Sequence, residues 1–168
     1  MDPTTANSPA TQSPVTILVV DDEETIVALC RTILQKAGFA ILEATSSPEA
    51  LKLCKNHQGA IDLLLTDLLL PPPDFQLASD TTEFPYVNGH ILAARAAALR
   101  KGLRIVLMSG VPERDLSSQS IKRGVLPFVQ KPLQQELLLH TIRETLKNPP
   151  PAIAANQTNT SGDVDWFD

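Results

Sequence analysis

Five polar residues lie at the ends of short apolar runs of the sequence, where buried strands would end. They are Asp21, Asp22, Asp67, Ser109 and Lys131. Clustered carboxylates repel one another and cost free energy when they leave water, so such a group needs a positive partner. Three carboxylates suit a hard cation with oxygen ligands, and Mg²⁺ is the expected one.

Together, these groups would stabilise an anion that carries several oxygens. Mg²⁺ takes one or two carboxylates and keeps positions open for water and phosphate oxygens. Lys131 adds a positive charge, and Ser109 adds a hydrogen-bond donor. Such an assembly stabilises a phosphoryl group in transfer, and a carboxylate within it can be the nucleophile that forms an acyl phosphate.

The elements that must position these residues alternate between strand and helix. Apolar runs predict strands at 15–20, 39–44, 61–66, 103–108 and 125–129. Helical spacing of apolar residues predicts helices at 23–37, 47–57, 89–101, 113–123 and 133–147. This order predicts an α/β fold in which a parallel sheet is covered on both faces, and sites in such folds form at the carboxyl ends of the strands.

The remaining composition predicts one domain with a tail at each end. Residues 1–14 are expected to be a flexible leader, and residues 148–168 a disordered tail with an acidic-aromatic tip. The formal net charge of −5 argues against nonspecific binding to nucleic acid or to an anionic membrane. Two cysteines in apolar stretches and the lack of a membrane-spanning apolar run lead us to expect a cytoplasmic protein without membrane contact.

Four motifs in order along the chain resemble those of a known family. They are ILVVDDE at 17–23, the strand-terminal Asp67, LMSG at 107–110 and FVQKP at 128–132. On these motifs, residues 15–147 resemble the receiver domain of bacterial two-component response regulators. The resemblance implies a flavodoxin-like (βα)₅ fold, which is a doubly wound, five-stranded parallel sheet in a three-layer α/β/α arrangement like that of chemotaxis regulators.

The resemblance also implies a role for each acidic residue. Asp67 would be the phosphoacceptor, which attacks the phosphorus of a phosphohistidine on a partner protein. Asp22 would bind Mg²⁺ directly, and Asp21 would help through water. Asp67 itself and the backbone carbonyl of Leu69 would complete the protein ligands of the metal.

The other matching residues would stabilise the phosphoryl group or report its presence. Ser109 would hydrogen-bond one phosphoryl oxygen and Lys131 would pair with another, while the Lys131–Pro132 peptide bond would be cis. Ser109 and Phe128 would act as the switch. They would pass the phosphorylated state to the face formed by the fourth helix, the fifth strand and the fifth helix.

Other interpretations of the same residues stay open. Asp21 and Asp22 could cap the helix that follows them, where acids are favoured. An aspartate-nucleophile phosphatase would need an acid two residues after the nucleophile, and Leu69 occupies that position. A receiver-like module that works without phosphorylation would usually lack the acid pair, the phosphoacceptor or the lysine.

The number of residues after the last predicted helix indicates how the protein would pass on its signal. About twenty residues follow it, too few for a helix-turn-helix domain. We therefore expect a single-domain response regulator that is not an enzyme and does not bind DNA directly. Its partners would be a sensor histidine kinase or phosphotransfer protein and a downstream protein target, in a phosphorelay or as an adaptor. Two alternatives remain. The chain could form a homodimer through the face of the fourth helix, the fifth strand and the fifth helix, or it could be a C-terminal receiver fragment of a hybrid histidine kinase.

Three features depart from the family pattern. Residues 72–88 lengthen the loop after the third strand by about fourteen residues. This insertion is either a lid over the site or a surface insertion that the fold tolerates. Leu69 and Val111 place apolar side chains near the site, which predicts a long-lived phosphorylated state because hydrolysis needs a positioned water. The tip around Trp166 and Phe167 is either a docking motif or a segment that folds back on the domain.

Overall fold

The apolar runs of the sequence form a parallel sheet of five strands in the order β2-β1-β3-β4-β5. The computed structural model describes residues 12–70, 87–116 and 126–152. The strands are β1 (Thr16–Val20), β2 (Ala40–Ala44), β3 (Leu63–Asp67), β4 (Arg104–Ser109) and β5 (Phe128–Gln130). The order reverses direction beside β1, so the sheet is doubly wound and the predicted fold class is confirmed.

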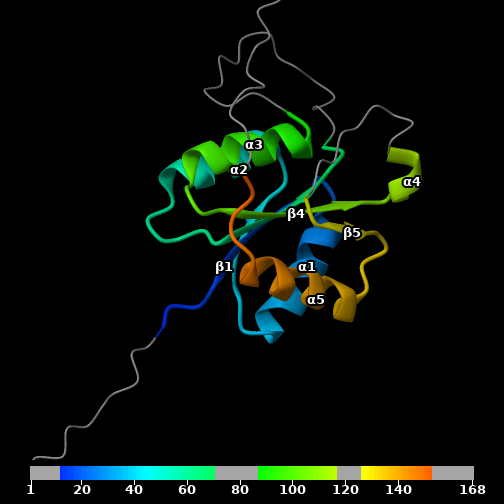
Figure 1. Ribbon diagram of the computed structural model, residues 1–168, viewed down its shortest axis with the longest axis horizontal. Coiled ribbons are helices and arrows are strands. Elements are labelled where there is room, and N and C mark those ends of the chain that lie inside the picture. The colour runs from blue at the N-terminus through cyan, green and yellow to red at the C-terminus, as the bar shows by residue number, and fades with distance from the viewer. Residues whose placement is uncertain (1–11, 71–86, 117–125, 153–168) are drawn as a thin grey trace, which may run out of the picture.

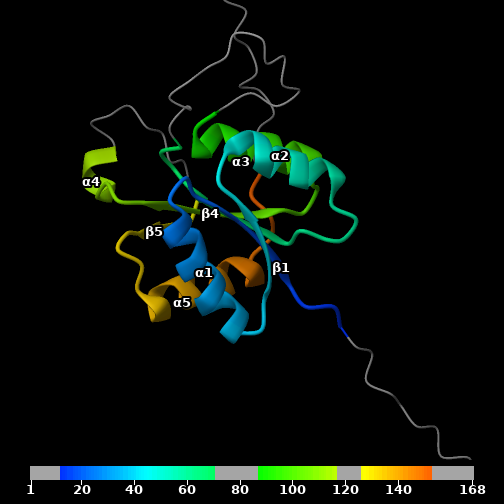
Figure 2. The ribbon, with the colours of Figure 1, turned by 180° about the vertical axis from the view of Figure 1, so that it is seen from behind.

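Helices cover both faces of this sheet (Figures 1 and 2). Those in the described residues are α1 (Glu24–Lys36), α2 (Ser47–Asn56), α3 (Gly89–Leu99), the short α4 (Glu113–Leu116) and α5 (Gln135–Lys147). Helices α1 and α5 form one layer, and α2 and α3 form the other. The predicted three-layer arrangement is therefore present.

Alternation along the strands divides the core between these two layers. In β1, Ile17 and Val19 belong to the core cluster under α1 and α5, whereas Leu18 and Val20 belong to the cluster under α2 and α3. Successive side chains of a strand point to opposite faces, so a strand that is apolar throughout is buried from both sides. Every residue from Ile17 to Val20 is accordingly fully buried.

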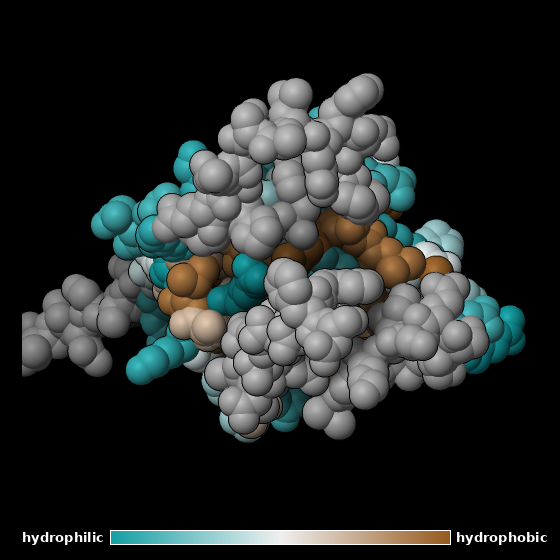
Figure 3. All heavy atoms as spheres, turned by 90° about the horizontal axis from the view of Figure 1, so that it is seen from above, coloured by the Kyte–Doolittle hydropathy of each residue, from teal (hydrophilic) through white to brown (hydrophobic). Residues whose placement is uncertain are grey.

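The layer of α2 and α3 leaves some apolar surface in contact with solvent. Figure 3, which looks onto this layer, shows hydrophobic residues gathered across its middle. Among the described residues, Ile91 and Leu99 of α3 are exposed. Arg100, which caps the end of α3, donates hydrogen bonds to the carbonyl oxygens of Cys54, His57 and Gly59 and so ties α3 to the end of α2.

Some element boundaries differ from the prediction. Strand β3 begins at Leu63 and includes Asp67. Just before the strand, the Asp62 carboxylate accepts a hydrogen bond from the Thr16 amide. Strand β5 begins at Phe128, and Pro127 before it has no N–H to donate to a neighbouring strand. The fourth helix is described only to Leu116.

Several predictions fall partly or wholly outside the described residues. These are most of the leader, most of the 72–88 insertion, the end of the fourth helix and the tip around Trp166. Within the described ranges, no helix is both long and apolar enough to cross a membrane.

Candidate functional site

Strand register brings the predicted site residues to one edge of the sheet. Val20 of β1 pairs with Thr66 of β3, so Asp21 and Asp67 both follow at the carboxyl edge. Asp67 pairs with Met108 of β4, and Ser109 pairs with Gln130 of β5, which Lys131 follows. Residues up to 110 positions apart in the chain are neighbours because all five strands run in the same direction.

Three carboxylates meet at this edge. Asp21, Asp22 and Asp67 each offer an oxygen, and these oxygens lie within 4.8 Å of one another. Asp21 is fully buried and Asp67 is only 7% exposed, whereas Asp22 faces solvent. The cluster is therefore half enclosed and open on the Asp22 side.

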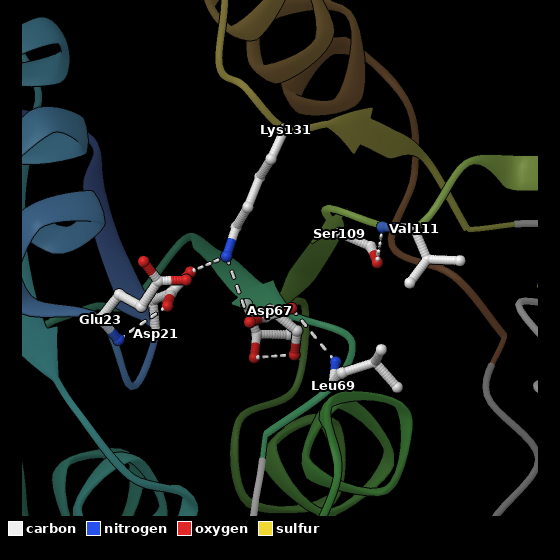
Figure 4. A network of polar contacts seen from close by, with 8 residues as sticks. Asp21, Glu23, Asp67, Leu69, Ser109, Val111 and Lys131 are labelled. Atoms are coloured by element: carbon white, nitrogen blue, oxygen red, sulfur yellow. Dashed lines mark hydrogen bonds and ion pairs between the residues drawn. The ribbon is translucent and has the colours of Figure 1, made fainter.

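Lys131 bridges the two buried carboxylates (Figure 4). Its Nζ lies 2.5 Å from Asp21 Oδ2 and 3.2 Å from Asp67 Oδ2. Burial lowers the pKa of Lys131, but its contacts with the two carboxylates outweigh burial and raise that pKa above the ordinary value. Burial raises the pKa of Asp67, and the nearby Lys131 ammonium opposes this rise without cancelling it.

The backbone fixes the second oxygen of each buried carboxylate. Asp21 Oδ1 accepts a hydrogen bond from the Glu23 amide at 2.9 Å, and Asp67 Oδ1 accepts one from the Leu69 amide at 3.1 Å. Each Asp therefore binds the amide two residues further on, which turns its Oδ2 toward Lys131. Sequence reasoning missed both amides, although aspartates commonly make such turns. It is Glu23, and not Asp21 or Asp22, that stands at the N-cap of α1.

The Asp21 side chain indicates that the cluster suits a cation. Asp21 Oδ2 is buried and makes no well-aligned hydrogen bond within the described residues, although the Lys131 ammonium lies beside it as an ion pair. The Lys131 ammonium balances only part of the negative charge of three neighbouring carboxylates, so a further cation would stabilise the cluster. The oxygen-only donor set of Asp21, Asp22 and Asp67 fits Mg²⁺.

The remaining predicted residues lie around this cluster. Ser109 is fully buried at the end of β4, and its hydroxyl accepts a hydrogen bond from the Val111 amide at 3.0 Å (Figure 4). Phe128 is half-buried at the start of β5 and packs against the core cluster under α2 and α3. The Lys131–Pro132 peptide bond is cis. The structure thus brings together Lys131 and the carboxylates, and it places the Ser109 hydroxyl against its own loop.

Comparisons with known proteins point to receiver domains. Residues 17–74 match the response regulator receiver domain. A CheY-like response regulator receiver domain protein from Methanospirillum hungatei JF-1 is 26% identical, with a TM-score of 0.61 over 80% of this chain and 95% of that chain. The receiver domain of the hybrid histidine kinase CckA is 23% identical, with a TM-score of 0.58 over 78% of this chain and 98% of that chain.

Two curated relatives are longer proteins. Sensor histidine kinase CheAY of Helicobacter pylori is 26% identical over 142 residues, which is 84% of this chain but 16% of the relative. Response regulator SaeR of Staphylococcus aureus is 23% identical over 130 residues, which is 77% of this chain and 50% of the relative. The chain therefore spans at most half the length of either relative.

The family match ends at residue 74, but the likeness to solved receiver domains continues through β4, β5 and α5. That later part of the chain supplies Ser109 and the lysine that bridges Asp21 and Asp67. The motifs, the sheet order and the family match agree. Residues 17–74 match the response regulator receiver domain, and we conclude that the chain has the fold of the solved receiver domains.

Proposed function

We propose that Asp67 accepts a phosphoryl group from a phosphohistidine on a sensor histidine kinase or phosphotransfer protein, in a reaction that requires Mg²⁺. The environment of Asp67 is the observation that carries the proposal. Its Oδ1 is held by the Leu69 amide and its Oδ2 by Lys131, beside two further carboxylates that can hold a cation. An aspartate that acts as a nucleophile needs a fixed orientation and a nearby cation that neutralises the charge of the phosphoryl group, and Asp67 meets both needs.

In the transfer, an Asp67 carboxylate oxygen would form a bond to phosphorus as the phosphorus–nitrogen bond of the donor breaks. The donor imidazole would keep the electron pair of that bond and take up a proton. Lys131 already contacts Asp67 Oδ2, and it would pair with a phosphoryl oxygen of the product. Bound Mg²⁺ would be held by Asp21, Asp22, Asp67 and the Leu69 carbonyl, and it would neutralise charge on the phosphoryl oxygens.

The proposed output is a phosphorylation-dependent contact with another protein, either in a phosphorelay or as an adaptor. In this proposal, Ser109 turns its hydroxyl from the Val111 amide to the phosphoryl group, and Phe128 changes its packing on the core. The changes would reach the face of α4, β5 and α5, where a target or a second copy binds. The protein would then be a cytoplasmic signalling component, with neither substrate turnover nor direct DNA binding.

Two alternatives to this proposal are that the chain is part of a larger kinase and that it works without phosphorylation. The likeness to the sensor histidine kinase CheAY, of which this chain covers 16%, supports the alternative that the chain is a receiver fragment of a larger histidine kinase. A phosphorylation-independent interaction module is disfavoured because Asp21, Asp22, Asp67 and Lys131 are assembled at one edge of the sheet.

Incubation with acetyl phosphate tests the proposed chemistry. We expect intact mass to show one added phosphoryl group, which requires Mg²⁺ and is absent from D67N. D62N is the matched control, because Asp62 precedes β3 at the opposite edge of the sheet and should not affect the adduct. An unmodified wild-type chain, or an adduct that persists in D67N, would contradict the proposal.

The apolar residues near Asp67 predict a slow loss of the phosphoryl group. Leu69 is 39% exposed, and Val111 is half-buried beside the Ser109 hydroxyl. Neither side chain can orient a water for hydrolysis, so L69N should shorten the phosphoryl lifetime by about tenfold. The decay of the adduct by mass spectrometry measures this, with L99N, at the far end of α3, as the control. Equal lifetimes in all three proteins would remove the explanation.

A further inference from the structure

The start of α3 packs directly against the backbone of Asp67, the proposed phosphoacceptor. The Gly89 amide donates a hydrogen bond to the Leu68 carbonyl at 2.9 Å. A Cβ atom added to Gly89 would lie 2.0 Å from the Asp67 carbonyl oxygen. The position of residues 87–89 therefore limits where the backbone of Asp67 and Leu68 can lie.

A serine of α2 holds this same segment from the other side. Ser47 is 2% exposed, and its hydroxyl accepts a hydrogen bond from the Val87 amide at 2.8 Å across 40 positions of the sequence. Val87 also packs against the core cluster under α2 and α3. The segment before α3 thus lies between the first turn of α2 and the end of β3.

Two adjacent serines have different functions at this point. Ser46 is the N-cap of α2, and its side chain accepts a hydrogen bond from the Glu49 amide. Ser47 is the first residue of α2, and its hydroxyl instead accepts a hydrogen bond from the Val87 amide, outside this helix. The start of α3 has its own cap in Asn88, whose side chain accepts from the Ile91 amide, so α3 does not need Ser47 in order to begin.

We propose that Ser47 is a positioning residue for the phosphoacceptor, which acts through Val87 and Gly89 on the backbone that carries Asp67. This inference rests on the proposed function of Asp67. Without the Ser47 hydroxyl, the Val87 amide loses its partner and residues 87–89 can move away from β3. The Leu68–Leu69 backbone then loses its support, and with it the Leu69 amide that holds Asp67 Oδ1.

The test compares S47A with S46A, which is the same substitution one residue earlier in the same helix. We expect the Leu69 amide of S47A to exchange with solvent about tenfold faster than that of the wild type, measured by NMR without Mg²⁺. Its affinity for Mg²⁺ and its initial rate of phosphorylation by acetyl phosphate should each fall about threefold. S46A should lower the unfolding midpoint and leave all three quantities unchanged.

A merely structural role for Ser47 would make S47A behave like S46A, and this result would overturn the inference. If S47A does not fold, S47C keeps the size with a weaker acceptor and should show smaller shifts in the same direction. A wild-type chain that takes up no phosphoryl group would refute the proposed function. The exchange rates and Mg²⁺ affinities would still decide whether Ser47 positions Asp67.

Discussion

Replacing Gly89 with alanine will lower the free energy of unfolding by about 3 kcal/mol or more and abolish phosphorylation of Asp67. The added Cβ would lie 2.0 Å from the Asp67 carbonyl oxygen, 2.8 Å from Leu68 Cα and 2.9 Å from the Asp67 carbonyl carbon. All three atoms belong to the backbone of a strand end, so none can rotate away. The clash outweighs the gain of about 1 kcal/mol that alanine brings to a helix over glycine.

A second glycine near the site provides the control for this substitution. Gly110 follows Ser109, and a Cβ atom added there would meet no atom within 4 Å. G110A should keep the stability of the wild type. Urea unfolding followed by circular dichroism measures both variants, and intact mass after acetyl phosphate measures the adduct. Equal stability of the two variants would show that the start of α3 is not pressed against Asp67.

Replacing Lys131 with methionine will lower the free energy of unfolding at pH 7 by about 3 kcal/mol and slow phosphorylation by about a hundredfold. Methionine keeps the length of the side chain but removes the charge that bridges Asp21 and Asp67. Two buried carboxylates then face each other without a cation. Removing one partner of a buried ion pair costs far more than removing an exposed one.

The loss of stability in K131M should depend on pH. Burial raises the pKa of Asp67 and Lys131 opposes that rise, so the variant should have a still higher Asp67 pKa. A carboxyl group whose pKa is raised in the folded state binds its proton more tightly there, so stability falls as pH rises through that pKa. The gap from the wild type should be small near about pH 4 and largest near about pH 7. The raised pKa of Lys131 itself matters only at alkaline pH.

Lys147 provides the matched control for Lys131. It pairs with Glu144 at 2.8 Å in the last turn of α5, where both side chains are exposed. K147M should leave stability unchanged at every pH. Urea unfolding in EDTA measures the three proteins, and added Mg²⁺ should restore part of the loss in K131M because a second cation reaches the carboxylates. A gap between K131M and the wild type that is independent of pH would contradict the bridging role.

The sequence by itself determined the architecture and the edge of the sheet at which the site lies. Apolar runs such as 17–20 and 63–66 bury both faces of a strand, so they predict a parallel sheet flanked by helices. Polar residues at the ends of such strands must meet at one edge, which identifies Asp21, Asp67 and Lys131. Strand boundaries differed from the prediction by up to three residues, as at β5, which begins at Phe128 directly after Pro127.

Only the tertiary structure decided which atoms meet. It showed that Lys131 contacts Asp21 as well as Asp67, and that the Ser109 hydroxyl is bonded to the Val111 amide. It also placed Ser47 against Val87 and Gly89 against the Asp67 backbone. The contacts of Lys131 with Asp21 and of Ser47 with Val87 join residues far apart in the chain. They depend on strand register and helix placement, which the whole packed core sets, so no short stretch of the sequence carries a signal for them.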